Sequence, residues 1–200
     1  MSTVLPDPGV LTPVMAQYWD LKTRHPDCVL LFRLGDFYEI FFDDAPAVAQ
    51  ALGIQLTRRG RAGGEDIPMC GIPWHQLDSY LPQLMSKGFR VALCEQMEDP
   101  AEARKRGHKA IVRREVTRVL TPGTLTEDNL LPGRQPNHLA AVACVKNELA
   151  VAWLDVSTGM FRCVSVPAAG LLNQLSAIAP SELLISQKLQ QQETLFETWA

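Results

Sequence analysis

The 200-residue sequence lacks the short motifs of common nucleotide-dependent and hydrolytic chemistry. It holds no Gly-x-x-x-x-Gly-Lys-Ser/Thr phosphate loop, no Gly-x-Gly-x-x-Gly fingerprint and no Gly-x-Ser-x-Gly nucleophile elbow. Because each motif supplies the backbone geometry that its chemistry needs, these residues are not expected to hydrolyse ATP. We predict no catalytic residue and no cofactor within them.

Long hydrophobic runs and export signals are also missing. No stretch of about 18 apolar residues occurs, and the amino-terminal MSTVLPDPGV has neither a basic region nor an apolar core of a signal peptide. With 46% hydrophobic and 20% charged residues, the chain can bury one or two cores. We predict a soluble, cytoplasmic protein without membrane contact.

Metal and disulfide signatures are weak. The sequence has no Cys-x-x-Cys or His-Glu-x-x-His pattern, and its four histidines are far apart. The cysteines are odd in number and widely spaced, as expected for reduced core thiols: Cys28, Cys70, Cys94, Cys144 and Cys163. We predict no metal site.

A large positive charge is absent too, but the arginines cluster. The net charge of -3 argues against a uniformly basic nucleic-acid binder. Arg58, Arg59 and Arg61 nevertheless fall in a predicted glycine-rich loop, and the stretch from 104 to 118 carries seven Lys or Arg against Glu115. Either cluster could contact phosphate, and either could be a solvated surface.

The most informative segment present is LGDFYEIFF, residues 34–42. Gly35 and Asp36 suit a two-residue hairpin turn between two strands. Alternation then places Phe37 and Glu39 on one face, so a carboxylate lies among aromatic side chains. Two ordinary interpretations compete: Phe37 as core, and Asp36 to Glu39 as the capping box of a helix.

The first part of the chain predicts a mixed α/β domain. Thr12 and Pro13 open a helix that should end near His25, and Gly53 should close another. The expected elements are helices over 45–52 and 75–87 and strands over 29–34, 54–57, 89–94 and 111–120, the last with its arginines pointing outward.

A change of pattern near residue 121 predicts a second domain. The segment TPGTLTEDNLLPGRQPN is rich in proline and glycine and lacks apolar periodicity. After it, strands over 139–144, 149–156 and 160–166 form an expected antiparallel meander, followed by a helix over 168–179 and a strand over 183–185. We predict domains at 1–120 and 135–200, joined by a linker at 121–134.

The ordered motifs GDFYEIF, DDA, LTRRG, IPMCGIPWH, ALCEQMEDP and VTRVLTPGT resemble the amino-terminal part of the MutS mismatch-recognition family. The resemblance is strongest between about Leu11 and Gly123 and implies a mixed-sheet mismatch-recognition domain. It further implies that a connector domain with an RNase H-like fold follows and is truncated here. The family's Phe-x-Glu motif falls on Phe37 and Glu39.

The resemblance also implies roles for single residues. Phe37 would be an apolar wedge that stacks on a mispaired base, and Glu39 would accept a hydrogen bond from a displaced base. Arg59 occupies the arginine position of the LT[KR]RG motif, and backbone phosphates would be its partners. The predicted DNA-binding residues are Phe37, Glu39, Arg58, Arg59, Arg61 and, as a weaker groove candidate, Gln96.

Partners and cofactors follow from the same resemblance. It implies duplex DNA with mismatches, a MutL-like protein and, in the full-length form, a homodimer in which one subunit places its Phe at the mismatch. ATP and Mg would belong to an ATPase domain beyond Ala200. Gln192 to Phe196 resembles a sliding-clamp-binding peptide, a match that chance also explains.

Two other functional classes stay open. An RNase H-like nuclease would need a metal-bound carboxylate cluster around Asp155, although Asp155-Val-Ser-Thr-Gly also signals a simple turn. A pure protein assembly module would be favoured if Phe37 were buried in its own domain.

Overall fold

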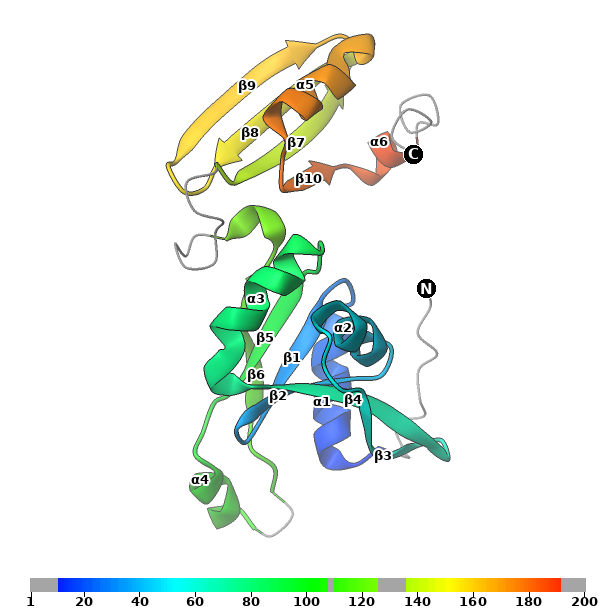
Figure 1. Cartoon of the computed structure of the whole chain (residues 1–200), viewed down its shortest axis with the longest axis vertical. Helices are drawn as coiled ribbons and strands as arrows, with labels where there is room; N and C mark the ends of the chain where they lie inside the picture. Colours follow the sequence, from blue (N-terminus) through cyan, green and yellow to red (C-terminus); the bar gives the residue numbers. More distant parts are fainter. Residues whose placement is uncertain (1–10, 108–109, 126–135, 192–200) are drawn as a thin grey trace. The chain divides into compact units, whose positions relative to one another are not determined.

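The computed structural model describes residues 11–107, 110–125 and 136–191. Contacts divide the chain into two compact units, Met1–Leu120 and Thr121–Ala200, and each is described by itself (Figure 1). The sliding-clamp-like peptide at 192–196 and most of the predicted linker, 126–134, lie outside the described residues.

The first unit is built on a six-stranded mixed sheet in the order β3-β4-β2-β1-β5-β6. Only the β1 and β5 pair is parallel in this sheet, and the other neighbours are antiparallel. The strands are β1 Val29–Leu34, β2 Phe37–Phe41, β3 Thr57–Ala62, β4 Glu65–Pro73, β5 Val91–Gln96 and β6 Arg114–Leu120. The predicted mixed α/β class is confirmed.

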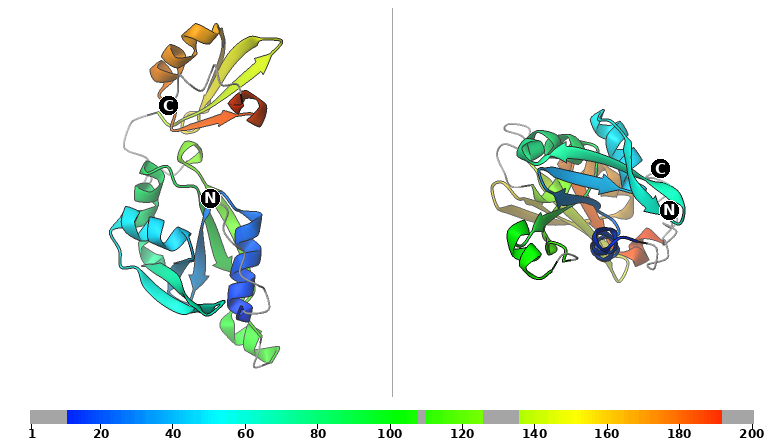
Figure 2. Two further views of the ribbon diagram at one scale, coloured as in Figure 1. Left: turned by 90° about the vertical axis from the view of Figure 1, so that its right-hand side faces the viewer. Right: turned by 90° about the horizontal axis from the view of Figure 1, so that it is seen from below.

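Helices cover both faces of this sheet (Figure 2). Helix α1, Pro13–Arg24, packs Tyr18 against Phe32 and Phe41, with ring centroids 5.4 and 5.1 Å apart. Helices α2, Asp44–Leu52, and α3, Leu77–Ser86, pack against β4 and each other, and the short α4 covers Pro100–Lys105. We call the side of the sheet covered by α1 the α1 face.

Local signals explain the start of this unit. The Thr12 side chain accepts a hydrogen bond from the Met15 amide at 3.4 Å, and Pro13 is the first helical residue, as the sequence predicts. Gly35 takes a φ of 57° in the β1–β2 turn. Since Phe37–Phe41 is a strand, the capping-box interpretation of Asp36 and Glu39 is wrong.

The arginine-glycine segment is a strand and not the predicted loop. The turn at Gly63 and Gly64, with φ of 60° and 88°, closes a β3–β4 hairpin. The strand expected at 54–57 therefore begins only at Thr57. Register shifts between Arg58 and Arg61, where Gly60 has a φ of 76°. Such a bulge lets two residues three positions apart face the same side.

The expectation that the arginines of β6 point outward is wrong for Arg114. This side chain is buried and donates to the Arg33 carbonyl at 2.6 Å and to Gln17 Oε1 at 3.1 Å. Its guanidinium lies 5.0 Å from the Phe32 ring centroid. The Val112 carbonyl is a third acceptor, at 2.9 Å. Three acceptors and a ring face compensate the burial of this guanidinium, and strand alternation alone does not predict them.

The second unit has a four-stranded sheet in the order β10-β7-β8-β9. The predicted meander is confirmed as β7 His138–Val145, β8 Glu148–Asp155 and β9 Met160–Val166, and α5 spans Leu171–Ile178. Strand β10, Glu182–Ile185, pairs parallel to β7, and the short α6 covers Gln187–Gln190. A 3₁₀ turn at Pro122–Thr124 joins this unit, where the Gly123 amide donates to Glu182 Oε2 at 3.2 Å.

The cysteines differ in solvent exposure between the two units. Cys28, Cys70 and Cys94 are buried free thiols, as predicted, whereas Cys144 and Cys163 are exposed on the strands of the second unit. Among the residues that the structure describes, no helix is long and apolar enough to cross a membrane.

Candidate nucleic-acid interface

The first residues of β2 form a gradient of exposure on the α1 face. Glu39 is in register with Phe32, which belongs to the core under α1, so alternation puts Phe37, Glu39 and Phe41 on that face. Their exposed fractions are 46%, 7% and 0%. Phe37 is thus not core, and the condition for a pure assembly module, a buried Phe37, is not met.

Glu39 is buried and only half satisfied. Its Oε1 pairs with Arg59 Nη1, whereas Oε2 is buried and has no hydrogen-bond partner among the described residues. Burial raises the pKa of Glu39, and the charges of Arg59 and Arg114 oppose that rise. A buried carboxylate oxygen without a partner costs free energy, which a ligand that donates a hydrogen bond would recover.

Gly71 of β4 leaves space beside both residues. It is the register partner of Glu39, and a Cβ added there would lie 3.7 Å from Phe37 Cδ1 and 3.8 Å from Glu39 Cγ. The glycine therefore keeps the surface beside the aromatic ring and the carboxylate free of side-chain atoms.

The three predicted arginines of β3 do not act alike. Arg58 Nη1 and Arg61 Nε pair with the carboxylate of Asp66, at 3.2 and 3.0 Å, and both arginine side chains are exposed. Arg59, between them, turns to Glu39. Two guanidinium groups on one carboxylate leave a net positive, solvent-facing patch.

Gln96 lies at the same level of the sheet as Phe37, on strand β5. Two register pairs show this: Phe32 of β1 lies beside Cys94 of β5, and Leu34 of β1 lies beside Phe37 of β2. Two residues beyond Cys94, Gln96 is half-buried on the same face, two strands from Phe37 or about 10 Å. The structure thus brings Phe37, Glu39, Arg59 and Gln96 to one end of the α1 face.

On the face opposite the α1 face, Arg33 packs against two aromatic rings and supports the β1–β2 hairpin. The sequence analysis did not predict this contact. The Arg33 guanidinium lies 4.7 Å from the Trp74 ring centroid and 5.5 Å from that of Tyr38. The Tyr38 hydroxyl donates to Glu95, and burial followed by that carboxylate raises the pKa of Tyr38 to about 12. The Trp in IPWH was the available signal. This packing fixes the strand that carries Phe37.

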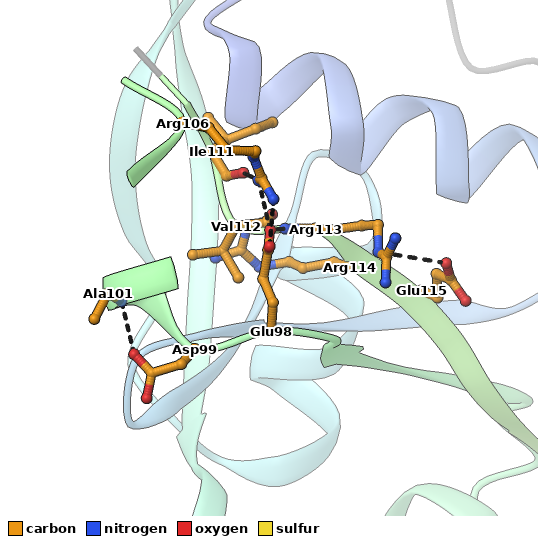
Figure 3. A network of polar contacts seen from close by, with 9 residues as sticks. All are labelled: Glu98, Asp99, Ala101, Arg106, Ile111, Val112, Arg113, Arg114 and Glu115. Carbon is orange, nitrogen blue, oxygen red and sulfur yellow. Dashed lines mark hydrogen bonds and ion pairs between the residues drawn. The ribbon is translucent and has the colours of Figure 1, made fainter. Parts of the chain in front are cut away.

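Part of the positive charge of the basic stretch, residues 104–118, is neutralised by acids that precede it in the sequence. Figure 3 shows one of them, Glu98. Glu98 accepts hydrogen bonds from both terminal nitrogens of Arg106, one at 2.6 Å, and from the Arg113 amide at 2.7 Å. These donors, with Arg106 first, lower the pKa of Glu98 to about 2. Lys105 pairs with Glu102 at 2.5 Å. The stretch is therefore a poorer phosphate contact than its sequence indicates.

Asp155 is a turn residue. Its carboxylate accepts hydrogen bonds from the Ser157 hydroxyl at 2.7 Å and the Thr158 hydroxyl at 2.8 Å, and these bonds lower its pKa to about 2. No group of three or more His, Cys, Asp or Glu that could hold a metal ion occurs in the described part of the chain. The carboxylate cluster that a nuclease would require is not found among those residues.

Fold and site together define a mixed α/β domain that presents an exposed aromatic ring beside a shielded carboxylate. Two family models match the chain: MutS domain I over residues 12–129 and MutS domain II over residues 137–199. The chain belongs to the MutS family, which confirms the resemblance seen in its motifs.

Curated relatives agree. The chain is 56% identical over 177 residues to the DNA mismatch repair protein MutS of Dinoroseobacter shibae, covering 88% of this chain and 20% of that protein. It is 53% identical over 192 residues to that of Caulobacter vibrioides, covering 96% and 21%. The chain thus spans about a fifth of the length of these relatives.

Proposed function

We propose that this chain recognises mismatched or unpaired bases in duplex DNA as part of a MutS mismatch repair protein. The observation that carries the proposal is the exposed Phe37 beside a buried carboxylate, Glu39, one oxygen of which has no hydrogen-bond partner within the described part of the chain. Membership of the MutS family supports the same function.

Phe37 acts as the wedge. Apolar side chains that enter the minor groove unstack a base step and kink the duplex, at a cost of a few kcal/mol. A mispaired step is cheaper to deform, so the wedge discriminates through deformability and not through a base code. Phe37 projects from a strand held between β1 and β4, which is the rigid support that such a wedge needs.

Glu39 supplies the second test. A carboxylate near phosphates is repelled unless it accepts a hydrogen bond from a displaced base. Glu39 Oε2 is available for that bond because Arg59 occupies only Oε1. Well-stacked DNA offers no such donor, so the repulsion penalises it.

Arg58 and Arg61 hold the DNA backbone, and Gln96 reaches toward the groove. Both arginines are exposed on the β3–β4 hairpin, and both pair with the same acid, Asp66. Phosphate contacts of this kind fix register without reading sequence. The compensated stretch around Glu98 contributes less.

The further partners of the whole protein are also proposals. The second unit binds a MutL-like protein, the full-length form is a homodimer that places one Phe37 at the mismatch, and ATP with Mg is used by sequence beyond Ala200. Cross-links from a MutL-like protein to residues 136–191, and from duplex DNA to residues 11–125, would support this division. The reverse pattern would contradict it.

The proposed recognition is tested by equilibrium binding of Phe37→Ala in a full-length MutS protein that carries this chain. Removing roughly 1 to 3 kcal/mol of base stacking should lower affinity for a G·T duplex toward that for the matched duplex. Phe161→Ala is the matched control, because Phe161 is also exposed but lies on β9 of the second unit. Normal discrimination by a folded Phe37→Ala protein would refute the assignment.

A further inference from the structure

Arg59 reaches out of its own hairpin. It belongs to β3, and its partner Glu39 belongs to β2, with β4 between the two strands. Thr57 is in register with Met69, which packs on the α1-side core, and Arg59 is two residues further on the same face. Past Gly60, the bulge returns Arg61 to the side of Arg58 and Asp66. The strand geometry therefore gives Arg59 a different partner from its two neighbours.

The surroundings of Glu39 make Arg59 its main electrostatic partner. The register partner of Glu39 on β1 is Phe32 and that on β4 is Gly71, neither of which can ionise. The charge of Arg114 on β6 also lowers the pKa of Glu39. Arg114 donates its hydrogen bonds to Arg33, Gln17 and Val112. Against burial, the charge of Arg59 and then its direct hydrogen bond to Oε1 favour the ionised carboxylate most.

We infer that Arg59 is a positioning residue for mismatch discrimination: it fixes Glu39 through Oε1 and leaves Oε2 as the single oxygen presented to a displaced base. The inference rests on the proposed role of Glu39. It replaces the simpler sequence prediction, in which Arg59 contacts phosphate directly, as Arg58 and Arg61 do.

The two roles of Arg59 predict different couplings. A residue that acts through Glu39 loses its effect on discrimination when Glu39 is already changed. A phosphate contact weakens matched and mismatched duplexes by similar factors in any background, and its loss reduces the salt slope by about one contact. A double-mutant cycle therefore separates them.

The experiment measures Kd for a G·T duplex and its matched counterpart with four full-length proteins: wild type, Arg59→Ala, Glu39→Gln and the double variant. We expect Arg59→Ala to lower the ratio of the two affinities about 3- to 10-fold, and the double variant to discriminate like Glu39→Gln alone. An equal effect of Arg59→Ala in both backgrounds would overturn the inference. If Glu39→Gln alone left discrimination unchanged, the proposed role of Glu39 would fail as well.

The pH dependence of discrimination separates this role from a purely structural role of Arg59, which would not change the pH profile. Without Arg59, the burial of Glu39 is less opposed, so its pKa rises and the carboxylate takes up a proton at higher pH. As the pH is lowered, discrimination by Arg59→Ala should fall at a higher pH than discrimination by the wild type, whereas Arg59→Lys should follow the wild type. Arg58→Ala is the matched control: Arg58 pairs with Asp66 and not with Glu39, so its loss should weaken both duplexes by similar factors and leave discrimination unchanged at every pH. A level profile for a folded Arg59→Ala protein would overturn the inference.

Discussion

Phe37 and Glu39 lie two residues apart on one face of β2, yet the ring is 46% exposed and the carboxylate 7%. The ring is therefore open to a ligand, whereas the carboxylate two residues further along the strand is almost fully covered. The following predictions are made for a full-length MutS protein that carries this chain.

Glu39→Gln should raise affinity for matched duplex and lower discrimination. The substitution keeps the size of the side chain and removes the charge that DNA phosphate repels. Titration of both duplexes at two salt concentrations measures the effect. Unchanged affinity for matched DNA would show that the charge of Glu39 does not oppose binding.

Asp66→Asn should strengthen binding to both duplexes and steepen its salt dependence. Asp66 is the shared partner of Arg58 and Arg61, and removing its charge frees both guanidinium groups for phosphate. The slope of log Kd against log salt should increase by about 0.9 for each additional phosphate contact, and one or two additional contacts are expected. A slope that stays constant would place the hairpin away from DNA.

The sequence predicted elements whose signals are local. Thr12 and Pro13 mark the start of α1, Gly35 marks the hairpin, and the short turns of the second unit mark its meander. It failed where the partner is distant along the chain. The burial of Arg114 over Phe32 and the Arg59 to Glu39 ion pair depend on tertiary contacts that no local pattern encodes. The β3–β4 hairpin was missed for another reason, because its local turn signal, Gly63 and Gly64, was interpreted as part of a loop.

The site followed the same division. The motifs located Phe37 and Glu39 because alternation along one strand is a local property. They could not show that Glu98, which precedes the basic stretch in the sequence, accepts hydrogen bonds from the Arg106 side chain and the Arg113 amide. Counting charges along the chain therefore overestimated the free positive charge of that segment.

Arg114→Ala should destabilise the first unit by about 2 to 4 kcal/mol, because hydrogen-bond acceptors on Arg33, Gln17 and Val112 would lose their charged donor. Arg113→Ala is the control, since Arg113 is exposed and its ion pair with Glu115 is long, at 3.9 Å. Chemical denaturation of the two variants gives the comparison. Equal stability would mean that Arg114 is not a structural residue.

Glu98→Gln should loosen the segment from Glu98 to Arg113 at neutral pH but not in strong acid. The folded pKa of Glu98 falls from 4.5 to about 2, so its contribution is fully present above 4.5 and is lost as pH falls through about 2. Hydrogen exchange of the Arg113 amide, which donates to Glu98, measures the difference. Equal protection in the variant and the wild type at neutral pH would show that this carboxylate does not brace the segment.

The central claim is that Phe37 opens the base step at a mismatch, and base stacking can be observed directly. A fluorescent adenine analogue placed next to a G·T pair brightens when it unstacks. At saturating protein, the wild type should brighten this duplex more than the matched one, and Phe37→Ala should bind with little brightening of either. An equal increase with Phe37→Ala at saturation would contradict the account.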